Sequence, residues 1–266
     1  MFGLLRKTAR YFNLPDPEYV SFLRKYEAKG AKKIAFYLIM GLIPGLLAYV
    51  FLFHLREPIM AWTGLSNTYT QFLILATMSI GWHMLVPFLM LRYADKLSFK
   101  QSLVYLGFAR LDLKGLLIVV PIITILFTLL SLPYMKYLFQ PQFDFLNAIP
   151  GLKMEEWHIF YQGYYDFPWP LLLIGVIGNF IGEEIYFRGY LLRKVGSLKG
   201  DWFIVSALFQ LYHVWQAPMN WAFLLLSVVI PCEILVKLRK NIYGAIAFHV
   251  FVNLFWGAIT FYLVGV

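Results

Sequence analysis

The chain has 266 residues, of which 61% are hydrophobic, 19% aromatic and only 14% charged. Soluble domains carry charge on about a quarter of their residues, so this composition excludes a soluble globular fold and indicates an all-α polytopic membrane protein. The formal net charge of +9 would suit a nucleic-acid-binding protein, but the distribution of the cations argues against that class. The single cysteine, Cys232, excludes an intrachain disulfide.

Seven apolar runs predict a bundle of about seven transmembrane helices, because most have close to the ~20 residues that cross a bilayer. They are residues 34–55, 72–91, 116–134, 169–187, 202–215, 222–236 and 242–264. Four prolines inside the runs predict kinks: Pro44, Pro87, Pro121 and Pro231.

The segment before the first run, residues 1–33, holds eight cations and no long apolar core. It therefore predicts a basic cytoplasmic tail that is either solvated or lies on the membrane surface. Residues 34–266 are expected to form one transmembrane helical domain, with the motif-bearing core at about 168–256.

The cations lie in alternate gaps between the runs. All but three of the 23 Lys and Arg residues fall in the tail and in the second, fourth and sixth gaps; the exceptions are Arg56, Lys136 and Lys153. The positive-inside rule then predicts a multi-pass protein with a cytoplasmic N-terminus and an external C-terminus. Anionic lipid head groups are the expected partners of the cations. The compact architecture suggests a bacterial cell membrane.

Two adjacent carboxylates, Glu183 and Glu184, stand near the end of the fourth run. Ionisable residues are costly in a membrane and mark a functional site. Glu184 and Arg188 are four residues apart and are expected to pair on one face, at the cytoplasmic end of the fourth helix. Glu183 points about 100° away and has no partner in its own helix.

Two later runs each carry a histidine with a companion four residues away. Phe209 precedes His213, and His249 precedes Asn253. At a rise of ~1.5 Å per residue, these positions reach a depth similar to that of Glu183 in the cytoplasmic half of the bilayer. The pattern predicts that they converge.

In this order on separate helices, Glu-Glu-x-x-x-Arg, Phe-x-x-x-His and His-x-x-x-Asn resemble the motifs of the CPBP family. These are intramembrane endopeptidases related to the type II CAAX prenyl protease, also called the Abi family. The resemblance covers residues 171–256, with a weaker likeness at 106–114. It implies an intramembrane active-site cavity open to the cytoplasmic side. It also implies hydrolysis of a peptide bond in a membrane-associated or prenylated protein or peptide.

Carried over by position, the resemblance implies that Glu183 and His213 activate water and that His249 and Asn253 bind the carbonyl oxyanion. Three further side chains would support this site: Glu184, Arg188 and Phe209. Glu233, another intramembrane acid, is expected to pair with Lys237 four residues on.

Two alternatives remain open. No cofactor is favoured, but Glu183, His213 and His249 are acceptable ligands for a hydrolytic zinc ion, although no His-Glu-x-x-His sequence supports one. The second alternative is that the chain is a non-proteolytic membrane scaffold or a bacteriocin-immunity protein of the same fold. A transporter is disfavoured because no inverted repeat is present.

Overall fold

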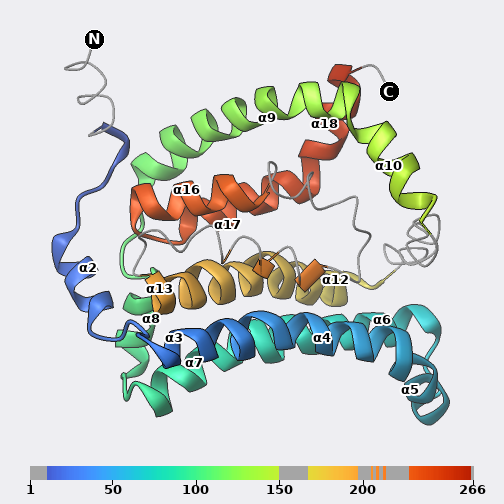
Figure 1. Cartoon of the computed structure of the whole chain (residues 1–266), viewed down its shortest axis with the longest axis horizontal. Helices are drawn as coiled ribbons and strands as arrows, with labels where there is room; N and C mark the ends of the chain where they lie inside the picture. Colours follow the sequence, from blue (N-terminus) through green and yellow to red (C-terminus); the bar gives the residue numbers. More distant parts are fainter. Residues whose placement is uncertain are drawn as a thin grey trace.

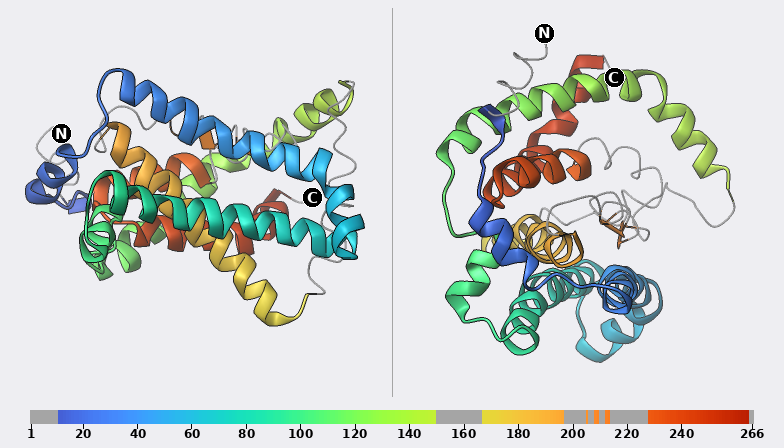
Figure 2. Two further views of the ribbon diagram at one scale, coloured as in Figure 1. Left: turned by 90° about the horizontal axis from the view of Figure 1, so that it is seen from below. Right: turned by 60° about the vertical axis from the view of Figure 1, so that its left-hand side comes forward.

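The computed structural model describes residues 11–149, 167–196 and 228–264, together with Val205, Leu208, Phe209, Tyr212 and His213. Within these ranges the chain forms helices and no strand, which confirms the all-α fold. The long helices lie side by side (Figures 1 and 2). Apart from those five single positions, the predicted run 202–215 lies outside the described residues, as does the start of the sixth run, 222–227.

Four helices in the described ranges are long and apolar enough to cross a membrane: Ala31–Thr63, Asn67–Ala94, Gly115–Tyr137 and Trp169–Gly196. A shorter apolar helix, Tyr243–Trp256, lies near the C-terminus. These helices confirm a polytopic membrane protein. The count of seven helices and the intramembrane cavity stay predictions.

Each long helix is built from α-helical segments and wider π-helical segments. The first contains α3 (Ala31–Ala35), η1 (Phe36–Leu42), α4 (Ile43–Val50), η2 (Phe51–Leu55) and α5 (Arg56–Thr63). The second contains α6 (Asn67–Ala76), η3 (Thr77–Leu85), α7 (Val86–Leu89) and η4 (Met90–Ala94). The third contains η5 (Gly115–Val119) and α9 (Val120–Tyr137), and α10 (Phe139–Asn147) follows it.

The remaining helices carry two of the three predicted motifs. The fourth long helix contains α12 (Trp169–Val176), η7 (Ile177–Gly182), η8 (Glu184–Leu191) and α13 (Leu192–Gly196). The C-terminal part contains α16 (Ile230–Arg239), α17 (Tyr243–Phe251), η11 (Val252–Trp256) and α18 (Gly257–Val264). α16 and α17 pack against each other.

The four prolines that predict kinks all follow π-helical turns. Pro44 comes after η1, Pro87 after η3 and Pro121 after η5, and Pro231 follows π-helical residues at 228 and 229. A proline lacks the backbone N–H, and its ring crowds the carbonyl four residues earlier. The wider π turn gives that carbonyl room, so the prolines account for these local distortions.

The fourth helix is longer than its apolar run. The run stops at Phe187, but the helix continues to Gly196. Glu184 and Arg188 therefore lie near the middle of the helix, and the expectation that they stand at its end was wrong. The apolar pattern places the end of the helix before the first cation, Arg188. The pattern cannot show that this cation is neutralised inside the protein.

Two short helices, α2 (Pro17–Arg24) and α8 (Phe99–Leu106), close one end of the bundle (Figure 1). The turned views show both helices at this same end (Figure 2). Leu23 of α2 is fully buried. The Tyr19 hydroxyl accepts a hydrogen bond from Arg193 Nε at 2.6 Å and donates one to the Tyr105 carbonyl at 2.9 Å. The described part of the basic N-terminal segment thus packs on the helix ends. We call α2, α8 and the helix ends beside them the basic end.

A bidentate ion pair at the basic end joins the last residue of α16 to the segment before η5. Arg239 Nε lies 2.5 Å from Asp112 Oδ2, and Nη2 lies 2.7 Å from Oδ1. Arg239 Nη1 also donates to the Phe12 carbonyl at 2.8 Å. Burial works to raise the pKa of the Asp112 carboxyl, but hydrogen bonds from Arg239 and the Gly115 amide outweigh it and hold this pKa below its ordinary value.

Acid should loosen the basic end. Because the pKa of Asp112 in the folded protein lies below its ordinary 3.8, the ion pair contributes fully above that pH. Its contribution is lost as the pH falls through the folded pKa. We expect the temperature of half-unfolding in detergent to decrease when the pH is lowered below about 4. Asp112→Asn should reduce this acid dependence. Glu57→Gln, at an exposed carboxylate, should leave it unchanged. An identical acid response in Asp112→Asn would rule out this ion pair as the cause.

The site-bearing helix crosses the second helix where η7 packs on η3. A Cβ added at Gly182 would lie 2.7 Å from the Ser79 carbonyl oxygen, and one at Gly178 would collide with the Ser79 side chain. Small residues allow the two backbones to approach this closely. The contact fixes the position of the residue that follows, Glu183.

Gly182→Ala should therefore lower stability by about 1–3 kcal/mol, because the backbone atom it meets cannot move aside as a side chain would. The control is Gly81→Ala on η3, where the nearest atom to an added Cβ is 3.9 Å away. Alanine favours a helix over glycine, so this control should be neutral or slightly stabilising. Thermal unfolding in detergent measures both; equal losses would mean that the close crossing is not the cause.

Candidate active site

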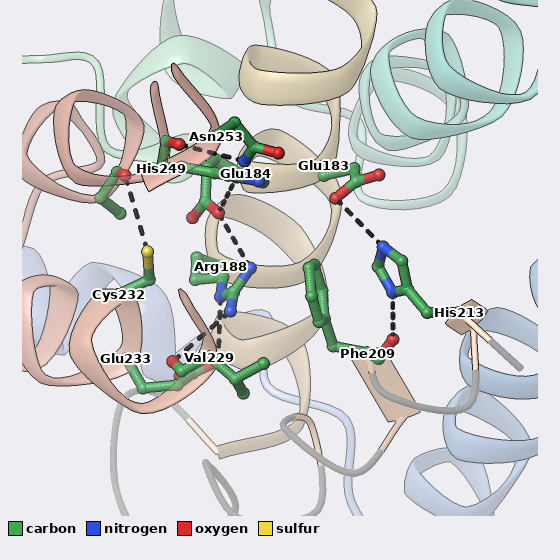
Figure 3. A network of polar contacts seen from close by, with 11 residues as sticks. Glu183, Glu184, Arg188, Phe209, His213, Val229, Cys232, Glu233, His249 and Asn253 are labelled. Atoms are coloured by element: carbon green, nitrogen blue, oxygen red, sulfur yellow. Dashed lines mark hydrogen bonds and ion pairs between the residues drawn. The ribbon is translucent and has the colours of Figure 1, made fainter. Parts of the chain in front are cut away.

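Glu183 and Glu184 point toward different partners, as Figure 3 shows. Glu183 faces His213, whereas Glu184 faces Arg188 and His249. Consecutive helical residues differ by about 100° in direction, which turns two neighbours in sequence into members of two separate clusters. Both are buried, Glu183 with 5% and Glu184 with 0% of its surface exposed.

The first cluster joins Glu183 to His213. Glu183 Oε2 lies 3.8 Å from His213 Nε2, and His213 Nδ1 lies 2.8 Å from the Phe209 carbonyl. A carbonyl oxygen has no proton, so Nδ1 is the donor in that bond. In a neutral ring, Nε2 then presents a lone pair toward Glu183. The separation of 3.8 Å is too long for a direct hydrogen bond.

The second cluster is centred on Glu184. Its Oε1 atom lies 2.9 Å from Arg188 Nη1 and 2.9 Å from His249 Nδ1. The pair of Glu184 with Arg188 is present as the four-residue spacing predicts. The contact with His249 was not predicted, since it joins η8 to α17 and leaves no trace in the spacing along either helix.

Arg188 has further partners besides Glu184. Its Nε lies 3.2 Å from Glu233 Oε1, and Nη2 lies 3.5 Å from the Val229 carbonyl. The guanidinium also stands 4.3 Å from the centre of the Phe209 ring. Glu233 was expected to pair with Lys237; spacing along α16 could not show that Arg188, on the neighbouring helix, contacts it as well. Its position in an apolar run was the one available signal.

Phe209 lies between the two clusters (Figure 3). Its ring centre is 4.6 Å from that of His213 and 6.5 Å from that of His249. Asn253 Nδ2 donates to the His249 carbonyl at 3.1 Å, and Asn253 is an exposed residue. The structure therefore brings together the residues of all three sequence motifs.

The zinc alternative requires three ligands in one place. Among the described residues, no three His, Cys, Asp or Glu side chains are grouped as a metal site. The three residues proposed as ligands are divided, because Glu183 faces His213 whereas His249 faces Glu184. Chelation, described below, is the direct test.

Residues 165–255 match the family described as Type II CAAX prenyl endopeptidase Rce1-like. Through this segment, the chain is similar to that family. The Rce1-like segment spans all three motifs and confirms the family that they predicted. No curated protein and no solved structure matches the chain. The family and the four apolar helices make the chain an integral membrane protein related to CAAX-type proteases.

Removing the cation of the second cluster should destabilise the Rce1-like segment. Arg188→Met leaves Glu184 and Glu233 buried without it, and breaking a buried ion pair costs about 3–5 kcal/mol. Adding Glu184→Gln and Glu233→Gln to Arg188→Met should recover much of this loss, because the triple variant leaves no unpaired carboxylate there. Thermal unfolding in detergent compares the variants. A triple variant as unstable as the single one would show that Arg188 matters for packing rather than charge.

Proposed function

We propose that the chain is an intramembrane endopeptidase that hydrolyses a peptide bond in a membrane-associated or prenylated substrate. The observation that carries this proposal is the pairing of Glu183 with His213. A carboxylate oxygen and a ring nitrogen, both proton acceptors, face each other at 3.8 Å. One water molecule about 2.8 Å from each can donate a hydrogen bond to both.

In the proposed reaction this water attacks the carbonyl carbon of the scissile bond. As the new C–O bond forms, a water proton passes to Glu183 or His213, and the carbonyl oxygen becomes an oxyanion. Collapse of the tetrahedral intermediate breaks the C–N bond, and the transferred proton goes to the leaving amine. The Phe209 carbonyl keeps His213 in the tautomer that can accept the proton.

His249 and Asn253 are proposed to stabilise the oxyanion. One N–H of the Asn253 amide donates to the His249 carbonyl, which leaves the second for the substrate. Glu184 holds the His249 ring through Nδ1, and Arg188 holds Glu184. Donors fixed in advance in this way contribute on the order of 10²–10³ in kcat.

We further propose that the substrate enters from the cytoplasm and that the basic end faces it. The alternate distribution of cations supports this orientation. Exposed cations of the basic N-terminal segment, among them Arg24, Lys25 and Lys29, suit contact with anionic lipid head groups in a bacterial cell membrane.

Cleavage of a fluorogenic farnesylated CAAX peptide in liposomes tests the proposal, with an unbiased peptide library alongside. Glu183→Gln and His213→Asn should each lower kcat by about 10²–10⁴-fold, the range expected on loss of a general base. Glu57→Gln, an exposed carboxylate at the opposite end of the bundle, should cleave like the wild type. Each protein is assayed with and without a chelator.

The arms of this assay separate the alternatives. Activity that resists chelation and is lost in both variants supports metal-free hydrolysis. Loss on chelation with recovery by zinc supports the metal-dependent alternative. Full activity in Glu183→Gln contradicts the assignment of the base. A folded wild type that cleaves nothing favours the scaffold or immunity function.

A further inference from the structure

One ring nitrogen of His249 is already engaged. Nδ1 lies 2.9 Å from Oε1 of Glu184, and Arg188 donates to the same oxygen. The carboxylate can only accept, so Nδ1 carries a proton. A neutral imidazole has a single N–H, and Nε2 would then be a lone pair that repels an oxyanion. Only the doubly protonated imidazolium serves Glu184 and the substrate oxygen together.

An imidazolium at His249 needs a counter-charge. Glu184 and Arg188 cancel each other and offer none. Glu233 is fully buried, lies 3.2 Å from Arg188 Nε and adds a second negative charge. With the imidazolium, these four groups sum to zero, which is the condition under which buried charges are tolerated.

The other ionisable groups nearby do not supply this balance. Glu183 faces His213, and Cys232 Sγ points to the Ala245 carbonyl at 3.6 Å. Lys237 interacts with Glu233, but it is partly exposed, so its charge is screened. Figure 3 shows Glu233 and His249 at the two ends of one chain of contacts that runs through Arg188 and Glu184.

We propose that Glu233 is a positioning residue that supplies the counter-charge for a doubly protonated His249, so that Nε2–H is available to the substrate oxygen. None of the three sequence motifs includes Glu233, which comes from α16. It acts through Arg188 and Glu184 and does not touch the substrate. This role deepens the proposed function and rests on it for the catalytic consequence.

The test is Glu233→Gln, which keeps the side-chain length and an oxygen that accepts from Arg188 Nε but removes the charge. Nitrogen-15 NMR of protein labelled at histidine reports the number of ring protons, and His249→Asn identifies the His249 signals. We expect two ring protons on His249 in the wild type at neutral pH and one in Glu233→Gln. kcat should fall on the order of 10²-fold with KM unchanged, as for loss of one oxyanion donor.

Two further variants separate charge from stability. Glu233→Asp keeps the charge and should keep the doubly protonated ring with most of the activity. Asp112→Asn removes a different buried carboxylate, which pairs with Arg239. Arg239 lies on α16, the helix that also carries Glu233. It should lower stability while leaving the His249 signals and kcat as in the wild type.

The inference is overturned if His249 carries one ring proton in the wild type, or keeps two in Glu233→Gln. An equal loss of kcat in Asp112→Asn and Glu233→Gln would also overturn it, since stability alone would then explain the loss. The NMR signal does not require turnover. If it behaves as expected while the wild type cleaves no peptide, the proposed function fails and the counter-charge role of Glu233 stands.

Discussion

The ion pair of Glu184 with Arg188, in the middle of a long apolar helix, is the constraint on which the rest of the site depends. Charge at this depth is tolerated only where other groups compensate it. The compensation comes from three directions: His249 on α17, Glu233 on α16 and the ring of Phe209. Because these partners lie on separate segments, folding of the bundle and assembly of the site are the same event.

The backbone around the site is shaped by small residues and by prolines. Gly178 and Gly182 bring the site-bearing helix close to Ser79, while proline-linked wide turns adjust the first three long helices and α16. Both features act on the backbone and not on the catalytic side chains themselves. They set the distances between Glu183, its neighbours and the side chains that they contact.

Much of the site follows from spacing, because pairs within one helix depend only on helical geometry. The Glu184–Arg188 pair and the separation of Glu183 from Glu184 are of this kind. Contacts between helices could not be predicted in the same way. The contacts of His249 with Glu184 and of Glu233 with Arg188 are of this second kind. The position of the Glu184–Arg188 pair along its helix was wrong for a related reason. The end of the helix was placed at the first cation after the apolar run, whereas the protein neutralises that cation and the helix continues.

The wide turn η7 ends directly before Glu183 and has a consequence for the two adjacent carboxylates. A π-helical turn holds about one residue more than an α-helical turn. If η7 tightened to an ordinary α-helix with no residue removed, each side chain after it would rotate by about 100°, the step of one residue. Glu183 would then take the direction that Glu184 now has. The width of a single turn thus assigns one carboxylate to His213 and the other to Arg188, and a one-residue deletion in η7 is tolerated only if that turn tightens with it.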